Sequence, residues 1–442
     1  MSELKEISQR MVEVARSAGA DDVVAETIVS QVKQVRFSNS QIDAVNSWSE
    51  RHLSLQVAIG KRVVASDIRT LEGLDPYAKA LVELARKAPP NRNYEGVASG
   101  RFKYRRGRGD SRITKLKDAS KFVHEAISGA ERFGADNSGG TFFAIYERSA
   151  LASTGGPLCE DEGTAANLSI RSFTQAEASG HAVCCTPTLS GMEAKKTGER
   201  AGEFASLAMD PVMGEQGKFD IIADPLFLGS LINSTSGMLS ALRVEIANSM
   251  YVKKIGKRVA SDQVSLVDDP TIRSTTRRAF DHEGVPARRN VLIKDGILKG
   301  YLHNTATAKR FKTKTTGNAG WLISAQPVAF HPVLVPGDWD SDELIADTKR
   351  GLYINNTWYT RFQNYATGEF STIPRDAILK VENGEIVGAA KNIRISDNLM
   401  NFWKSVDGIS KESREIYWWE EAAPPSTLPT LRARQLTVTR SA

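Results

Sequence analysis

The chain has 442 residues, of which 41% are hydrophobic and 25% charged, a composition ordinary for a soluble globular protein. A formal net charge of +6 is too small, at this length, to indicate nucleic-acid binding by itself. No apolar run approaches the ~20 residues needed to cross a bilayer, and the first residues lack the apolar core of a signal peptide. Three scattered cysteines, Cys159, Cys184 and Cys185, do not make a disulfide framework, so we expect a cytoplasmic protein.

Residues 1–90 are predicted to form a small α/β domain. Apolar residues three and four apart predict a helix over residues 2–18. A period of two over residues 23–68 predicts a meander of antiparallel strands. Asp75-Pro76 then begins a second helix that runs to about Lys87.

Residues 91–116 are predicted to be a basic linker. The stretch from Arg101 to Lys117 holds eight Arg and Lys residues against a single acid, Asp110. A solvated linker is the favoured interpretation of such a charge run. A contact with nucleic acid or with an acidic peptide stays open as the alternative.

Residues 117–215 are predicted to form a middle α/β domain. A helix is expected over 117–133, followed by strand-like segments around 139–155 and 164–188. A further helix is expected over 190–208, with Ala201-Gly202 as its weak point.

Residues 218–442 are predicted to form a large β-rich domain with packed helices, which makes the whole chain α+β. A short strand over 218–223 is followed by a long helix over 226–250. Lys294-Asp295-Gly296 and Glu382-Asn383-Gly384 each predict a tight hairpin turn between apolar strands. A helix is expected to start at Ser341, and the last strand covers 431–438.

Several groups of residues suggest chemistry but have a plainer interpretation. His181, Cys184 and Cys185 could be part of a metal site, with His331 as a recruit, but strand residues are favoured because two neighbouring ligands are too few. His282 and His303 could approach each other and work with Glu283 in acid–base chemistry, although a structural role is favoured. The aromatic residues Trp403, Tyr417, Trp418 and Trp419 are either a subunit contact or core packing.

Ordered motifs run through the third region. They are Phe280–Pro286 with Arg289, Val291–Asn304, Gly351–Ile354, Thr367–Ser371, Glu382–Ile386 and Leu428–Arg432. In this order they resemble the TldD/PmbA family of zinc peptidases. The resemblance covers about residues 225–440, and the helix–meander–helix start of the chain is similar to the first domain of that family.

The resemblance implies two kinds of subunit. The TldD kind carries His-Glu-x-x-x-His, whose histidines bind zinc and whose glutamate is the general base, and it takes a further cysteine ligand near the C-terminus. Here Asn233 stands at the first ligand, Ser234 at the base, Met238 at the second ligand and Ser410 nearest the cysteine. No histidine lies between His181 and His282. This pattern is similar to the TldE, or PmbA, kind of subunit, so neither catalytic residues nor a metal site are expected in this chain.

By the same resemblance, the chain is expected to be inactive alone and to form a heterodimer with a TldD-like subunit that holds the zinc. The complex would trim or degrade unfolded or precursor peptides, which bind in extended form. The expected structural or peptide-groove residues are those of the shared motifs: Asp281, Glu283, Gly284, Pro286, Gly368 and Ser371. Nucleic acid and membranes are not expected partners. The alternatives are a stand-alone homodimer that binds peptides or DNA, and an independent peptidase with a new metal site.

Overall fold

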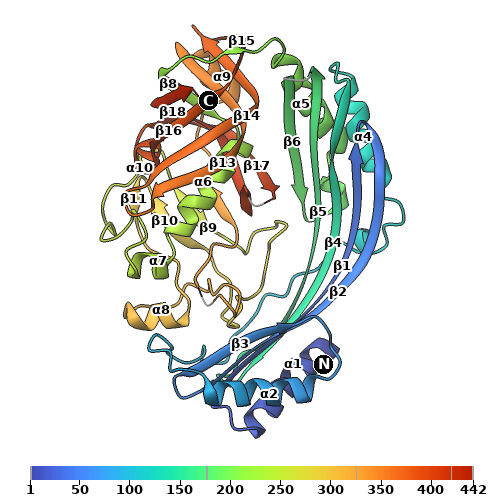
Figure 1. Ribbon diagram of the computed structural model, residues 1–442, viewed down its shortest axis with the longest axis vertical. Helices are drawn as coiled ribbons and strands as arrows, with labels where there is room; N and C mark the ends of the chain where they lie inside the picture. The colour runs from blue at the N-terminus through green and yellow to red at the C-terminus, as the bar shows by residue number, and fades with distance from the viewer. Residues whose placement is uncertain (1, 176–177, 325, 420, 441–442) are drawn as a thin grey trace.

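The structure, a computed structural model, describes residues 2–175, 178–324, 326–419 and 421–440. It confirms the α+β class: a long curved sheet lies beside a second β-rich part (Figure 1). The N-terminus lies at the foot of the curved sheet, and the C-terminus lies within the second part (Figure 1).

The first sheet joins two regions of the sequence. Among the described residues it has six strands, all antiparallel, in the order β3-β2-β1-β4-β5-β6. These strands are β1 (Asp22–Ser38), β2 (Gln41–Ile59), β3 (Arg62–Ile68), β4 (Asn137–Ser153), β5 (Leu158–Gln175) and β6 (Ala178–Thr186). Because β1 pairs with both β2 and β4, one sheet runs through the regions 1–90 and 117–215.

Helices cover one face of the first sheet, at its two ends. They are α1 (Glu3–Ser17) and α2 (Leu74–Lys87) at one end, and α4 (Ser120–Glu131) and α5 (Ala194–Leu207) at the other. The predicted weak point in α5 does not break the helix. Gly202 instead allows close packing, since a Cβ there would lie 2.5 Å from the carbonyl oxygen of Ala130 on α4. The short helices α3 (Ser111–Thr114) and η1 (Leu189–Gly191) lie in the connections.

The second sheet forms the core of the C-terminal part. Within the described ranges it contains twelve strands, with β18 pairing with β8, β12, β16 and β17. The strands of this part are β7 (Val212–Met213), β8 (Gly217–Ala223), β9 (Leu266–Asp268), β10 (Asn290–Lys294), β11 (Ile297–Leu298), β12 (Pro332–Leu334), β13 (Arg350–Asn364), β14 (Glu369–Glu382), β15 (Glu385–Lys391), β16 (Ile393–Asn398), β17 (Val406–Trp418) and β18 (Ala422–Arg440). The helices are α6 (Pro225–Met238), α7 (Ala241–Glu245), α8 (Thr305–Arg310), α9 (Ser341–Ala346) and α10 (Leu399–Lys404).

The predicted helix over 226–250 is wrong, because α6 ends at Met238 and α7 is a separate short helix. The backbone of Leu302, from a distant segment, hydrogen-bonds to residues at the break between the two helices. The Leu302 N–H donates to the carbonyl of Leu239, and the Ala241 N–H donates to the carbonyl of Leu302, each at 2.9 Å. This strand-like contact with a distant segment takes the backbone groups that a continuous helix would need.

Both predicted hairpins are confirmed. Asp295 and Gly296 have φ of 49° and 75°, and Asn383 and Gly384 have φ of 51° and 87°. Two successive positive φ angles are what a tight hairpin turn requires. The predicted helix start at Ser341 is also confirmed, although the N-cap is Asp340, which forms a capping box with Glu343.

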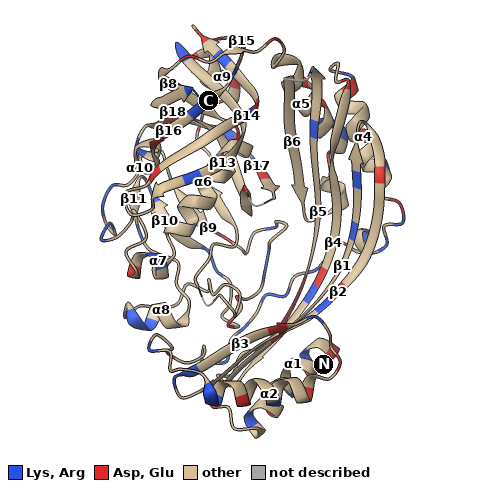
Figure 2. Cartoon of the chain, viewed as in Figure 1, with Lys and Arg blue, Asp and Glu red and all other residues tan. Residues whose placement is uncertain are grey.

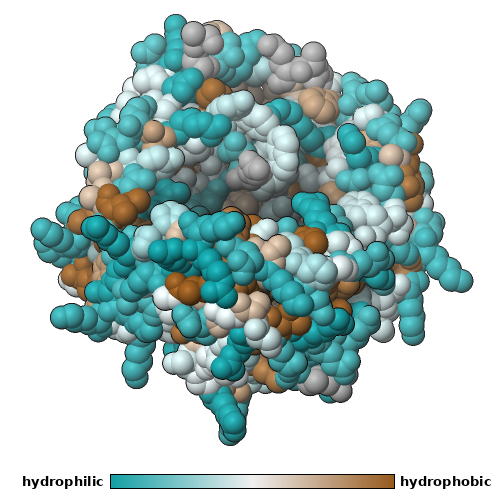
Figure 3. All heavy atoms as spheres, turned by 60° about the horizontal axis from the view of Figure 1, so that its bottom comes forward, coloured by the Kyte–Doolittle hydropathy of each residue, from teal (hydrophilic) through white to brown (hydrophobic). Residues whose placement is uncertain are grey.

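Charges lie interspersed over both parts of the chain (Figure 2). The face in Figure 3 is mostly hydrophilic, with its hydrophobic residues scattered in small groups. Of the helices in the described residues, none has the length and apolar character needed to cross a lipid bilayer.

Candidate functional site

Helix α6 carries the positions at which the resemblance implies zinc chemistry. Asp224 caps it by accepting the Leu226 N–H at 3.0 Å, and Pro225 occupies its first turn. The helix is buried among β13, β17 and β18 of the second sheet, and its hydrophobic residues belong to the largest core. Packing on several sides therefore holds α6 and its side chains in fixed positions.

The three positions on α6 do not come together as a site. Met238 is fully buried in the core, whereas Asn233 and Ser234 are half-buried. Residues five apart in an α-helix differ in direction by about 140°, so Asn233 and Met238 point to different sides. The Ser234 hydroxyl donates to the carbonyl of Ser230 at 3.1 Å, within the helix itself.

Ser410, on β17, has a local structural role. Its side chain is fully buried, donates to the carbonyl of Glu412 and accepts the Thr430 N–H, each at 3.0 Å. An amide, two hydroxyls and a thioether are poor zinc ligands, and two of them are already committed to hydrogen bonds. These residues do not fit a zinc ion.

The motif around Asp281 is a buried turn. Asp281 accepts the N–H groups of Glu283, Val285 and Ala319 at 2.9–3.0 Å. Burial raises its pKa, and the nearby charge of Glu283 adds to that effect. Gly284 has φ of 79°, and a Cβ there would lie 2.6 Å from Pro157, so the turn requires glycine.

Glu283 and Pro286 complete this turn. The Glu283 carboxylate accepts the Thr305 N–H at 2.9 Å, at the first turn of α8, and burial raises its pKa. Pro286 forms an isolated bridge with Phe280. The groups that hold the turn together are thus its own carboxylates and backbone.

Gly368 and Ser371 lie elsewhere, around β14. Gly368 has φ of 85° and lies against the sulfur of Met250. The Ser371 hydroxyl accepts a hydrogen bond from Arg394 at 2.8 Å. The six motif residues proposed for the peptide groove are therefore separated into two places.

The histidines that suggested chemistry are held by hydrogen bonds. His181 contacts Ser169 and Asn356 through its two ring nitrogens, each at 2.9 Å, and burial lowers its pKa to about 4. His331 contacts Thr276 at 2.8 Å and Thr427 at 2.9 Å, and burial likewise lowers its pKa to about 4.

The two neighbouring cysteines are not arranged for metal binding. Their thiols contact backbone carbonyls, Cys184 that of Gly191 and Cys185 that of Tyr417, and burial raises both pKa values. No group of three or more His, Cys, Asp or Glu residues in the described part of the chain is arranged to hold a metal ion.

His282 and His303 have different surroundings. His282 Nδ1 lies 2.6 Å from Glu26 Oε2 on β1, and the imidazole packs against Trp321, so this pair links the first sheet to the C-terminal part. His303 packs instead against Tyr301 and Phe311.

The C-terminal aromatic residues divide between the two interpretations. Trp403 is buried in the core and donates to Thr235 on α6 at 2.9 Å. Trp419 is 64% exposed, beside Trp358. Core packing thus describes Trp403, while the exposed Trp419 is free for a contact.

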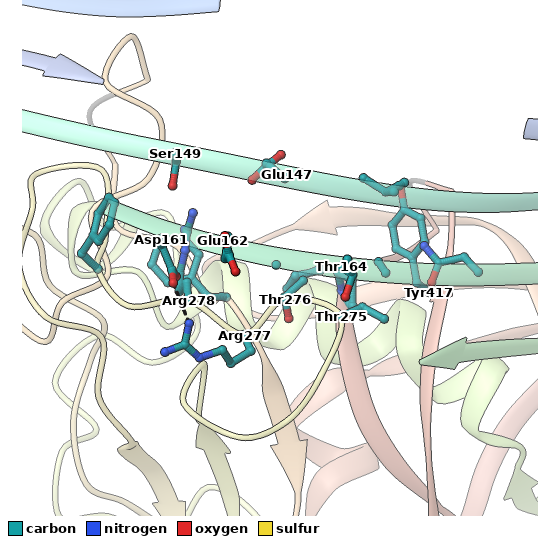
Figure 4. Close-up of a pocket in the computed structure, with 18 of the residues that line it drawn as sticks. Glu147, Ser149, Asp161, Glu162, Thr164, Thr275, Thr276, Arg277, Arg278 and Tyr417 are labelled. Atoms are coloured by element: carbon teal, nitrogen blue, oxygen red, sulfur yellow. Dashed lines mark hydrogen bonds and ion pairs between the residues drawn. The ribbon is translucent and has the colours of Figure 1, made fainter. Parts of the chain in front are cut away.

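A cleft lies between the first sheet and the C-terminal part. Its first cavity has a volume of about 420 Å³ and is lined by β4, β5 and the loop 271–279. Figure 4 shows Asp161, Glu162 and Thr164 of β5 beside the loop residues Thr275–Arg278, with Tyr417 at one end. Asp161 fixes the loop, because it accepts hydrogen bonds from Arg277 at 2.7 Å and from the Ala279 N–H at 2.6 Å.

Glu147 is a carboxylate of this cleft, on β4. It is solvent-accessible, yet the surrounding protein displaces bulk water and raises its pKa, against the opposing charge of Arg278.

A second cavity of about 520 Å³ continues the cleft along the edge of β5. It shares Glu162, Gly163, Thr164, Thr275 and Arg277 with the first cavity. The basic stretch forms one wall of this second cavity. The sequence also singled out Phe280 and Tyr417, which line the first cavity. The residues of β4, β5 and the loop 271–279 were missed because they belong to no motif.

An antiparallel sheet of six described strands beside a second β-rich part that buries α6 defines the class of the fold as α+β. Residues 216–440 match the family model described as the PmbA/TldA metallopeptidase C-terminal domain, which is half of the chain. The chain therefore belongs to the PmbA/TldD family.

Relatives agree with this assignment. The chain is 31% identical over 225 residues to a metalloprotease of Methanothermobacter thermautotrophicus, covering 50% of this chain and 49% of that protein. It is 33% identical over 205 residues to a metalloprotease of Methanocaldococcus jannaschii, covering 45% and 44%. The matches thus span about half the length of these curated relatives. The crystal structure of TldE from Thermococcus kodakarensis shares the fold, with a TM-score of 0.87, 19% identity, and coverage of 98% of this chain and 100% of that one.

Proposed function

We propose that this chain is the non-catalytic subunit of a heterodimeric zinc metallopeptidase of the TldD/TldE type. The main support comes from the residues that stand where the family has zinc ligands and the general base. Met238 is a core residue, and the hydroxyls of Ser234 and Ser410 donate hydrogen bonds to backbone carbonyls. Residues committed to packing and local structure have no capacity left for a metal. The structural likeness to a protein named TldE supports the same choice of subunit.

This assignment gives the two subunits different roles. A TldD-like partner contributes zinc and its glutamate, while this chain completes the chamber and contributes the cleft between β4, β5 and the loop 271–279. The substrates are unfolded or precursor peptides. We place the complex in the cytoplasm, because Cys159, Cys184 and Cys185 are free thiols.

The test is co-expression with a TldD-like protein that carries His-Glu-x-x-x-His. We expect the two chains to co-elute at micromolar concentration, with zinc and cleavage of an unfolded peptide found only when the partner is present. The matched variants are Glu→Gln at the partner's general base, which should abolish cleavage, and Asn233→Ala with Ser234→Ala in this chain, which should not.

Separate elution of the two chains would refute the subunit assignment. Stoichiometric zinc in this chain alone, together with cleavage by it, would support an independent peptidase instead. A stable homodimer that retains peptide or duplex DNA and ignores the partner would support the stand-alone alternative.

A further inference from the structure

The second cavity of the cleft has an excess of cations. Its lining includes five arginines, Arg106, Arg108, Arg112, Arg273 and Arg277, against two acids, Asp110 and Glu162. Three of the arginines are neutralised: Arg106 pairs with Glu160 and Glu162, Arg112 with Asp110, and Arg277 with Asp161, all at 2.7–3.3 Å. Arg108 and Arg273 remain.

Arg108 and Arg273 have no counter-charge. Both are exposed, and neither guanidinium has an ion pair or hydrogen bond with any residue that the structure describes. Arg108 comes from the basic stretch and Arg273 from the loop 271–279, so the fold brings two distant cations to one cavity. Like charges held in a cavity attract an anion more strongly than either would alone.

Ser274 supplies an independent observation. Its side chain is 3% exposed and lines the same cavity, yet its hydroxyl has no hydrogen-bond partner. A buried hydroxyl without a partner is unfavourable, and a bound water, an ion or a ligand atom is one explanation for such a group. An acceptor oxygen from a ligand would satisfy it.

We propose that this cavity binds a carboxylate of the peptide substrate, held by Arg108, Arg273 and Ser274. A guanidinium matches the planar, two-oxygen shape of a carboxylate, and the serine hydroxyl donates a further hydrogen bond. The carboxylate comes either from a free C-terminus or from an Asp or Glu side chain. The proposal rests on the proposed function, since it takes a peptide as the substrate and the first cavity as the place for the rest of that peptide.

A peptide is favoured over nucleic acid by the remaining charges. Three arginines of the cavity are already neutralised, which leaves two unpaired cations in a half-open cavity of about 520 Å³. Nucleic-acid sites instead present many unpaired cations along an open surface.

The test measures binding to the full chain alone by fluorescence anisotropy. The probes are short fluorescein-labelled peptides: one with glutamates and a free C-terminus, one with the glutamates replaced by glutamine, and one with an amidated C-terminus. Arg108→Gln with Arg273→Gln should raise the Kd of the acidic peptide by about a hundredfold, and Ser274→Ala by about fivefold. The control is Arg148→Gln, an exposed arginine of β4 outside both cavities, which should leave the Kd within about twofold.

The two altered peptides identify the source of the carboxylate, because affinity should fall with whichever modification removes it. The proposal is overturned if the acidic peptide does not bind, or binds the double variant as tightly as the unaltered chain. It is also overturned if a labelled DNA duplex binds more tightly than the peptide and loses affinity in the double variant. Because this chain is tested alone, the result is independent of co-elution with a zinc-bearing partner.

Discussion

Replacing Met238 by alanine is expected to destabilise the C-terminal part by about 3 kcal/mol, within the roughly 2–5 kcal/mol typical of Met→Ala in a core. The Met238 side chain is fully buried in the core that α6 shares with the second sheet. The change removes apolar contacts and leaves a cavity. The surrounding strands are close-packed and cannot move in to fill it. Met238→Leu keeps the volume and should cost less than about 1.5 kcal/mol.

Tryptophan fluorescence is a suitable probe of this change, because six of the seven tryptophans follow residue 218 and Trp403 hydrogen-bonds to Thr235 of α6. At roughly 2–4 °C per kcal/mol for a domain of this size, Met238→Ala should lower Tm by about 6–12 °C. Two results would refute the reasoning: a loss below about 1 kcal/mol for Met238→Ala, or a Met238→His variant that is stabilised by added zinc. Either would mean that this side chain faces a site instead of the core.

Two further predictions concern packing and pH. Gly198→Ala should destabilise the packing of α5 against α4 by about 2 kcal/mol, because the new Cβ would lie 1.8 Å from the carbonyl oxygen of Ala126. Gly237→Ala, with open space around the new Cβ, should instead stabilise α6 by about 0.5–1 kcal/mol. Thermal unfolding that ranks the two variants the other way would contradict this reasoning. Burial lowers the pKa of His331 from 6.5 to about 4, so its contribution to stability is present above pH 6.5 and is lost as pH falls toward 4. His331→Asn should therefore flatten the fall of unfolding free energy in that window by up to about 1.4 kcal/mol per pH unit, measured in urea titrations, and an unchanged slope would count against it.

Local signals in the sequence predicted local structure well. The turns at Asp295-Gly296 and Asn383-Gly384 were predictable because these residues tolerate the positive φ that a tight hairpin demands. The boundary after Met238 was not, because the helix ends through a backbone contact with Leu302, which lies far along the chain. The spacing of apolar residues within the helix does not predict a contact with a distant segment.

The candidate site also depends on contacts between segments that are far apart in the sequence. The absence of histidine from α6 is readable directly, but the placement of Met238 in the core depends on strands that close over the helix. The cleft is harder still, since Arg108, Arg273 and Glu147 come from three separate segments. Of these three segments, only the basic stretch was singled out by the sequence, and it could not indicate which of its arginines would pair with carboxylates.

The position of β1 has a consequence for how the chain can be divided. From Val24 to Phe37 this strand hydrogen-bonds to β4, while its other edge pairs with β2. A fragment ending near residue 90 would leave that long edge bare, and bare strand edges invite aggregation. During synthesis, β1 must likewise wait until β4 has left the ribosome before both its neighbours exist, so truncations intended to isolate the beginning of the chain should extend past β4.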